Sequence, residues 1–272
     1  MRVLGAAAGG AVAWWLFTKR RKRTASGAAA AIFIGSSFSV LVNQQQRITE
    51  AFDVAKTKTI VSGATTLPQL ADAAQEHPDT MLLKAMNVGL KAGNDASAAI
   101  NAMWASVRPA FLNADFDPAK LTKDDITHDI AALDAAQAKL STIEPGCKTT
   151  FKRELEQIKT EADKAAITDS ISHHLILDVA DRQNVMAGCR NETVAATHDF
   201  WQALRAQFSV MLVRGYKVSN DQVLFSTDEA VNDFNAAGEA SAAALQRLKA
   251  IDDEEKKFVA GKQAAWNNMM KN

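Results

Sequence analysis

The chain has 272 residues, of which 47% are hydrophobic and 23% charged, so it carries enough apolar side chains for a folded core. Its net charge is zero, but residues 1–49 contain seven bases and no acid, which leaves 50–272 with 31 acids and 24 bases. An acidic body without a basic stripe repels phosphate backbones, and nucleic acid is therefore excluded as an expected partner.

The N-terminal segment combines apolar runs with a block of positive charge. Runs at 3–17 and 25–42 flank a basic turn at 19–23, which consists of Lys19, Arg20, Arg21, Lys22 and Arg23. A helix needs about 20 mostly apolar residues to cross a bilayer, so the second run is long enough and the first is marginal. We therefore expect residues 1–46 to form a membrane anchor, either as one transmembrane helix or as a helical hairpin.

The charges and aromatic residues of this segment predict its orientation. The positive-inside rule keeps the basic turn in the cytoplasm, and the pair Trp14 and Trp15 is typical of a membrane interface. The lipid bilayer is therefore an expected partner, and the remaining chain is expected in the periplasm of a bacterium with an inner membrane.

Other interpretations of the N-terminus stay open. A cleaved signal peptide fits less well, because Val40, Leu41 and Val42 lack the small-residue pattern of a cleavage site. A mitochondrial targeting segment fits the acid-free, Ala-rich and basic composition, although its basic residues would normally be spread along an amphipathic helix. A buried soluble hairpin would have to hide two apolar helices while it exposes the basic turn.

Residues 47–272 have the composition of an all-α domain. Ala, Lys, Gln, Glu and Leu dominate, and no alternating apolar and polar run is long enough to predict a strand with assurance. We expect an antiparallel multi-helix bundle, with a smaller helical subregion over 64–120 as one option. Within that subregion, Gly93 is expected to separate a helix at 80–90 from another at 95–107.

The middle of the chain contains clear helix signals. Thr122 and Asp125 resemble a capping box, which would start a helix that continues to about Leu140. Pro145-Gly146 is expected to turn the chain. The next helix should bury the seam formed by Phe151, Leu155, Ile158, Ala162 and Ala165, which have spacings of 4, 3, 4 and 3.

Two further helices are expected in the last hundred residues. A helix from Asp169 should break or kink at Gly188 and resume through Trp201, Leu204, Phe208 and Met211 to end near Gly215. The stretch 226–229, Ser-Thr-Asp-Glu, has the form of a capping box and should open the last long helix. The expected buried stripe of that helix consists of Val231, Phe234, Gly238, Ser241, Leu245 and Leu248.

Cys147 and Cys189 are the two cysteines of the chain, 42 positions apart in the predicted bundle. In an exported domain such a pair is most simply a disulfide, and the alternative is two buried free thiols. Neither cysteine belongs to a CxxC motif, so redox catalysis and structural zinc are not predicted.

One set of side chains has spacing suited to a metal ion. His174, Asp178 and Asp181 lie at i, i+4 and i+7 and would share one helix face, although a solvated polar strip explains the same spacing. His128 among Asp124, Asp125 and Asp129 is better interpreted as a charged helix start, because acids there complement the helix dipole. Nucleophile, phosphate-binding and dinucleotide motifs are absent, and no cofactor is predicted.

These observations favour a non-enzymatic, membrane-anchored helical bundle that binds another envelope protein or a second copy of itself. The alternative is a small-ligand-binding sensor module that signals through a separate membrane partner, and it would require a pocket with a few convergent polar groups. An enzyme would require the His174 face or the His128 cluster to meet further ligands in space.

Overall fold

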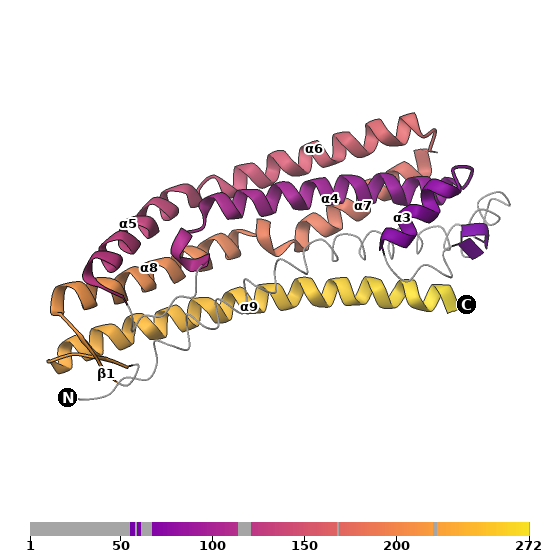
Figure 1. Ribbon diagram of the computed structural model, residues 1–272. Coiled ribbons are helices and arrows are strands. Elements are labelled where there is room, and N and C mark those ends of the chain that lie inside the picture. Colours follow the sequence, from indigo (N-terminus) through magenta and orange to yellow (C-terminus); the bar gives the residue numbers. More distant parts are fainter. Residues whose placement is uncertain are drawn as a thin grey trace. The chain divides into compact units, whose positions relative to one another are not determined.

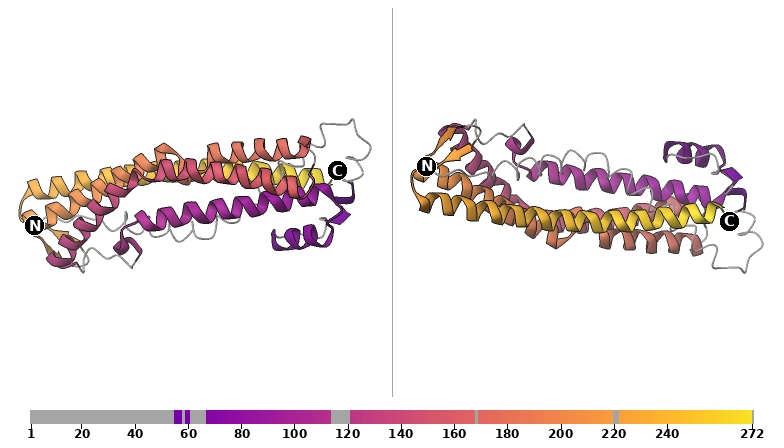
Figure 2. Two further views of the ribbon diagram at one scale, coloured as in Figure 1. Left: turned by 90° about the horizontal axis from the view of Figure 1, so that it is seen from above. Right: turned by 90° about the horizontal axis from the view of Figure 1, so that it is seen from below.

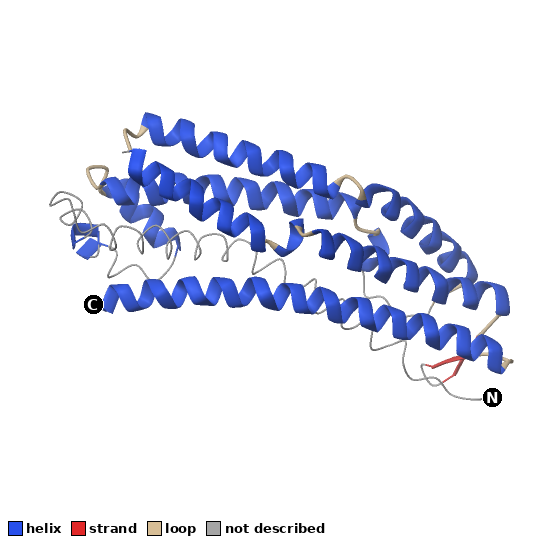
Figure 3. Cartoon of the chain, turned by 180° about the vertical axis from the view of Figure 1, so that it is seen from behind, coloured by secondary structure: helices blue, strands red, loops and turns tan. Residues whose placement is uncertain are grey.

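The computed structural model describes residues 55–57, 59–60, 67–113, 121–167, 169–219 and 222–271. These residues are predominantly helical, which confirms the all-α class for them (Figure 1, Figure 3). The elements in chain order are α3 Leu67–Glu76, α4 Met81–Val107, η1 Ala110–Asn113, α5 Lys123–Leu140, α6 Ile143–Lys164, α7 Asp169–Val185, η3 Ala187–Cys189, α8 Asn191–Arg214, β1 Lys217–Ser219, β2 Gln222–Leu224 and α9 Asp228–Lys271.

The predicted anchor at 1–46 lies outside the described residues, and its structure stays a prediction. No helix in the described ranges is both long enough and apolar enough to cross a membrane. The predicted subregion 64–120 contains α3, α4 and η1, and its status as a separate unit also stays a prediction.

Helix α4 corrects the expectation that Gly93 separates two helices. The helix runs without interruption from Met81 to Val107. Glycine lowers helix propensity by only about 1 kcal/mol relative to Ala, and tertiary packing easily compensates that cost. A Cβ at Gly93 would lie 3.3 Å from Nη1 of Arg182, so this glycine serves a close approach between α4 and a side chain on α7.

Helix α5 confirms the capping box that the sequence predicts. The Thr122 side chain accepts a hydrogen bond from the Asp125 N–H over 3.2 Å, and the Asp125 carboxylate accepts one from the Thr122 N–H over 2.9 Å. The helix ends at Leu140, as expected, and Ser141 is its C-cap.

Helix α6 shows that Pro145-Gly146 does not turn the chain. The helix begins at Ile143, so both residues lie in its first turn. Proline is tolerated there because an N–H in the first turn has no intrahelical acceptor. The expected seam is also displaced. Ile158 and Ala162 are buried, but Phe151 and Leu155 are only half-buried, and the fully buried positions beside them are Thr150 and Glu154.

The break at Gly188 is confirmed. Helix α7 ends at Val185, the 3-10 turn η3 contains Gly188, and α8 begins at Asn191. The four apolar residues expected on the next stripe, Trp201, Leu204, Phe208 and Met211, are all buried. Helix α8 ends before Gly215, whose φ of 68° is one that glycine adopts without a steric cost.

A short antiparallel hairpin follows α8 and was not predicted. Strands β1 and β2 have three residues each, with Val218 opposite Val223. Such short strands fall below the length at which alternation becomes visible in a sequence. The hairpin packs against the protein through its second strand. Val223, Leu224 and the following Phe225 are buried, whereas all three residues of β1 are exposed.

Helix α9 extends from Asp228 to Lys271 as one continuous helix (Figure 2). Its N-terminal cap is Thr227, whose Oγ1 accepts a hydrogen bond from the Ala230 N–H over 3.2 Å. The helix therefore starts one residue later than a box between Ser226 and Glu229 would imply. Of the predicted stripe, Phe234, Ser241 and Leu248 are buried, and Val231, Gly238 and Leu245 are half-buried.

The described chain divides into two compact units. Unit 1 contains residues 102–145 and 188–252, and helices α5 and α8 pack antiparallel within it (Figure 1). Arg205 on α8 bonds both carboxylate oxygens of Asp134 on α5, at 2.6 and 3.3 Å. Two aromatic pairs also pack within unit 1. The ring centroids of Phe111 and Phe208 are 6.0 Å apart, and those of Phe225 and Phe234 are 5.2 Å apart.

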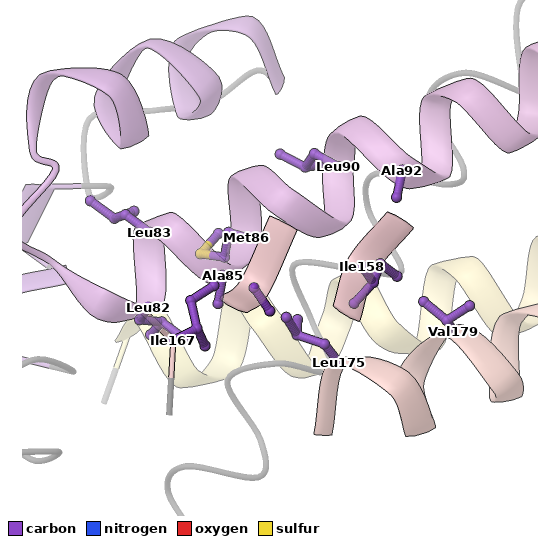
Figure 4. Close-up of a cluster of buried hydrophobic side chains, with 11 residues drawn as sticks. Leu82, Leu83, Ala85, Met86, Leu90, Ala92, Ile158, Ile167, Leu175 and Val179 are labelled. Atoms are coloured by element: carbon purple, nitrogen blue, oxygen red, sulfur yellow. The ribbon is translucent and has the colours of Figure 1, made fainter. Parts of the chain in front are cut away.

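Unit 2 contains residues 146–187 and 253–271, together with the described residues up to 101. Its apolar core lies between α4, α6 and α7, as Figure 4 shows. The buried members of this core are Leu82, Leu83, Ala85, Met86, Leu90, Ala92, Ile158, Ala162, Ile167, Leu175 and Val179.

Candidate functional site

A buried pair of opposite charges lies beside the core of unit 2. Glu154 on α6 and Arg182 on α7 have side chains that are 0% and 2% exposed, and Nη2 of Arg182 donates a hydrogen bond to Oε1 of Glu154. The second carboxylate oxygen accepts from Nε2 of Gln183 over 3.3 Å. Both oxygens of Glu154 are therefore occupied, which a buried carboxylate requires.

The apolar residues around this pair explain why it is shielded from water. Figure 4 shows the core residues Ile158 and Val179. Ile158 follows Glu154 by one helical turn and Val179 precedes Arg182 by one turn, so in the sequence the charges continue the stripes that form the core. Gly93 on α4 borders the guanidinium from another side. A Cβ there would lie 3.3 Å from Nη1 and 3.8 Å from Oε1 of Glu154.

Arg182 has more hydrogen-bond donors than acceptors around it. Its Nε and Nη1 are buried and have no hydrogen-bond partner, and Oγ of Ser97 on α4 is in the same condition. Burial lowers the pKa of Arg182 to about 10, and the negative charge of Glu255 on α9 acts in the opposite direction. The guanidinium therefore remains charged at neutral pH, with N–H groups that can bind a further acceptor such as a carboxylate, a carbonyl group or water.

Glu255 also binds the backbone of η3, the turn that follows α7. Its Oε2 accepts a hydrogen bond from the Ala187 N–H over 2.9 Å. Side chains or backbone from α4, α6, α7 and α9 thus converge on one polar cluster, which we call the Arg182 cluster and define as Gly93, Glu154, Arg182, Gln183 and Glu255.

The disulfide predicted from the sequence is present. Cys147 and Cys189 are disulfide-bonded, and Cys147 is 2% exposed. The prediction that Cys147 and Cys189 form a disulfide bond is therefore confirmed.

The metal hypothesis for His174, Asp178 and Asp181 stays a prediction. All three belong to α7, but the side chains of His174 and Asp178 lie outside what the structure describes. Asp181 is exposed and lies 4.0 Å from Nζ of Lys262. Among the described residues, no group of three or more His, Cys, Asp or Glu side chains could hold a metal ion.

The acidic cluster at the start of α5 has one member in an unexpected environment. Asp124 and Asp125 occupy the first turn, which agrees with their interpretation as a charged helix start. Asp129, one turn further on, is only 5% exposed. Burial raises its pKa to about 6; His128 opposes this effect and Asp125 adds to it.

The remaining predicted site residues belong to the N-terminal segment. Trp14, Trp15 and the basic turn Lys19 to Arg23 lie outside the described residues, so their role at a membrane stays a prediction.

Sequence reasoning missed the Arg182 cluster, although a signal was present. Arg182 follows Leu175 and Val179 at spacings of 4 and 3, and Glu154 precedes Ile158 and Ala162 at spacings of 4 and 4, so both charges fall on apolar stripes.

Comparisons with protein-family models, with curated proteins and with solved structures find no match to this chain.

Proposed function

We propose that this chain is a non-enzymatic, membrane-anchored helical bundle on the periplasmic side of a bacterial inner membrane, where it binds another envelope protein or a second copy of itself. The disulfide between Cys147 and Cys189 is the observation that carries the proposal. Stable disulfides form in oxidising compartments and are rare in the cytosol, so the bond favours an exported domain.

The N-terminal sequence supports an anchor for that domain. The uncharged stretch 24–46 is long enough to cross a bilayer, and the positive-inside rule favours a cytoplasmic location for the basic turn 19–23. The two signals agree, because a cytoplasmic basic turn followed by one span would place the cysteines outside.

Exposed apolar side chains in unit 1 support a binding role. Val213 near the end of α8 is 78% exposed, and Val218 on β1 is 40% exposed. Single exposed apolar residues are common, but these two lie within six positions of each other, at the junction of α8 with the hairpin.

Topology mapping tests the location. A reporter that is active only in the periplasm should be active when it is fused after residue 60 and at the C-terminus. Thiols of the intact protein should react with a membrane-permeant reagent only after reduction. A matched chain in which Lys19 to Arg23 are replaced by Gln should lose the uniform orientation. Reporter activity in the cytoplasm, or thiols that react without reduction, would contradict the proposal.

Site-specific photo-crosslinking tests the binding role. A photoreactive residue at position 213 in membranes should give a discrete adduct, whose mass separates a second copy from another envelope protein. Position 239, which is exposed on α9, serves as the control. Equal adduct yields at 213 and 239, or no adduct at either, would argue against a binding surface at the α8–β1 junction.

The Arg182 cluster favours the small-ligand sensor as a second candidate. A buried guanidinium with two donor nitrogens that lack acceptors, Nε and Nη1, is suited to a small carboxylate. The probes are acetate and aspartate, which should raise the melting temperature of the wild-type chain and not that of Arg182→Lys. Equal shifts in both proteins, or no shift in either, would count against a carboxylate site at Arg182.

A further inference from the structure

Two buried hydrogen-bond donors of unit 1 lack an acceptor among the described residues. They are Nε1 of Trp201 on α8 and Nε2 of Gln137 on α5. Trp201 is 1% exposed and belongs to the largest fully buried side chains that the structure describes. An indole N–H and an amide NH₂ group can only donate, so each requires an acceptor. Buried polar groups without a protein partner are usually bonded to ordered water.

The two donors lie at the same level of the packing between α5 and α8. Nε of Arg205 bonds the Asp134 carboxylate over 2.6 Å, which fixes the register of this antiparallel pair. Trp201 precedes Arg205 by four positions, and Gln137 follows Asp134 by three. Both steps lead one turn in the same direction and stay on the helix faces that carry the ion pair. Trp201 and Gln137 are therefore neighbours across the two helices.

Helix α9 passes this level with a small side chain. Nη2 of Arg247 donates a hydrogen bond to Asp199 over 2.7 Å, and a Cβ at Gly238 would lie 3.1 Å from Nε2 of Gln207. These two contacts set an antiparallel register between α8 and α9, and they bring the fully buried Ala244 close to the level of the indole. A methyl group covers less of the indole than a larger apolar side chain would, so the packing is compatible with a small occupant.

We propose that one ordered water molecule binds between α5 and α8, where it accepts hydrogen bonds from Nε1 of Trp201 and Nε2 of Gln137. Both donors are neutral and Arg205 is already paired with Asp134, so an anion bound here would be poorly compensated. A neutral acceptor fits better, and water is the smallest one. The bound water joins the two helices and fixes the orientation of the indole. The site goes beyond the proposed function and does not depend on it.

A crystal structure of the full chain in detergent, at a resolution that shows ordered water, tests the site directly. One peak of the size of a water molecule should lie within about 3.2 Å of both nitrogen atoms. The absence of that peak would overturn the proposal, and so would the amide group of Gln137 in direct contact with Nε1. A peak too large for one water molecule would also contradict it.

NMR of the full chain with isotope-labelled tryptophan tests the site in solution. The chain has five tryptophans, and Trp201→Phe identifies the Trp201 indole signal by its loss. In the wild type, the Hε1 proton of Trp201 should show cross-relaxation with water although the residue is buried. Gln137→Leu should abolish this signal, because the water would keep one donor and a buried water needs two to four polar partners.

Gln202→Leu is the matched control. It makes the same change at an exposed position of α8, beside Trp201, and should leave the cross-relaxation at the wild-type intensity. Equal intensities in the wild type and Gln137→Leu would show that Gln137 does not hold the water. A wild-type spectrum without cross-relaxation at Hε1 would show that no water is bound there. The wild-type measurements keep the test decisive if Gln137→Leu does not fold.

Discussion

Nε1 of Trp104 donates a hydrogen bond to the carbonyl oxygen of Gly188 over 2.6 Å, although the two residues are 84 positions apart. Trp104 belongs to α4, and Gly188 lies in the turn η3 that interrupts the path from α7 to α8. A carbonyl group in such a turn has no regular helical donor, and the indole N–H satisfies it. The chain can therefore break between α7 and α8 without leaving this backbone acceptor unpaired.

Removing the indole donor should destabilise the protein. Trp104→Phe keeps an aromatic ring but loses the N–H, and we expect the free energy of unfolding to fall by about 1 kcal/mol. Urea denaturation followed by circular dichroism measures the change. Met103→Leu, at the neighbouring half-buried position, keeps the hydrogen bond and should leave the midpoint unchanged. Equal midpoints for Trp104→Phe and the wild type would show that this bond contributes no net stability.

The disulfide should make a larger contribution. Cys147 and Cys189 close a span of 42 residues, and the chain-entropy model assigns such a loop about 3 to 4 kcal/mol. Reduction should therefore lower the urea midpoint of the wild-type chain by a corresponding amount. The double variant Cys147→Ala, Cys189→Ala should unfold at the reduced midpoint with or without reductant. A wild-type midpoint that ignores reductant would contradict this assignment.

Local chemistry explains which parts of the fold were predictable. The start of α5 depends on Thr122 and Asp125, three positions apart, and the end of α8 depends on Gly215, whose backbone conformation favours glycine. Each signal acts within one helical turn, so the sequence contains all the information. The break at Gly188 has a local signal in the low helix propensity of glycine, but its carbonyl group is satisfied by the distant Trp104.

Tertiary context explains the errors. Gly93 was expected to break a helix, but its missing Cβ admits Arg182 from α7, and this neighbour is 89 positions away in the sequence. Pro145 was expected in a turn, but it falls in the first turn of α6, where its missing N–H costs nothing. In both cases the residue type was informative, and its position relative to other elements decided the outcome.

The candidate site could be predicted only in part. The pairing of Cys147 with Cys189 followed from their number and the expected compartment. Glu154 and Arg182 were overlooked because charged side chains are seldom buried, so a charge on an apolar stripe is normally assigned to the surface. Each charge can be buried only because the other neutralises it. The two residues are 28 positions apart, so the pairing is not visible in the local sequence.

Breaking the buried pair should be costly, whereas removing it whole should not. Glu154→Leu leaves the guanidinium of Arg182 buried without its carboxylate, and we expect a loss of about 3 to 5 kcal/mol. Adding Arg182→Met should recover most of that loss. Glu156→Leu removes an acid from the exposed face of the same helix and should change stability by less than about 0.5 kcal/mol. Urea denaturation compares the four chains, and a double variant no more stable than Glu154→Leu would show that the loss does not arise from the unpaired charge of Arg182.

Asp129 gives the protein a predictable dependence on pH. Its pKa rises from 3.8 to about 6 on folding, because the carboxylate is buried in α5. Between these two values the folded state binds the proton and the unfolded state releases it. The free energy of unfolding must therefore fall as the pH rises through this window, and the full cost of the buried charge applies above about pH 6.

Asp129→Asn should remove that dependence, since an amide of the same shape stays uncharged. Relative to the wild type, the variant should gain on the order of 1 kcal/mol at about pH 7 and little at about pH 3, where the wild-type carboxyl group is largely protonated in both states. Urea denaturation at both pH values measures the difference, and subtraction cancels every other titrating group. Asp124→Asn, at an exposed position of the same helix, supplies the comparison. A gain that is equal at both pH values would show that the Asp129 carboxylate carries no burial cost.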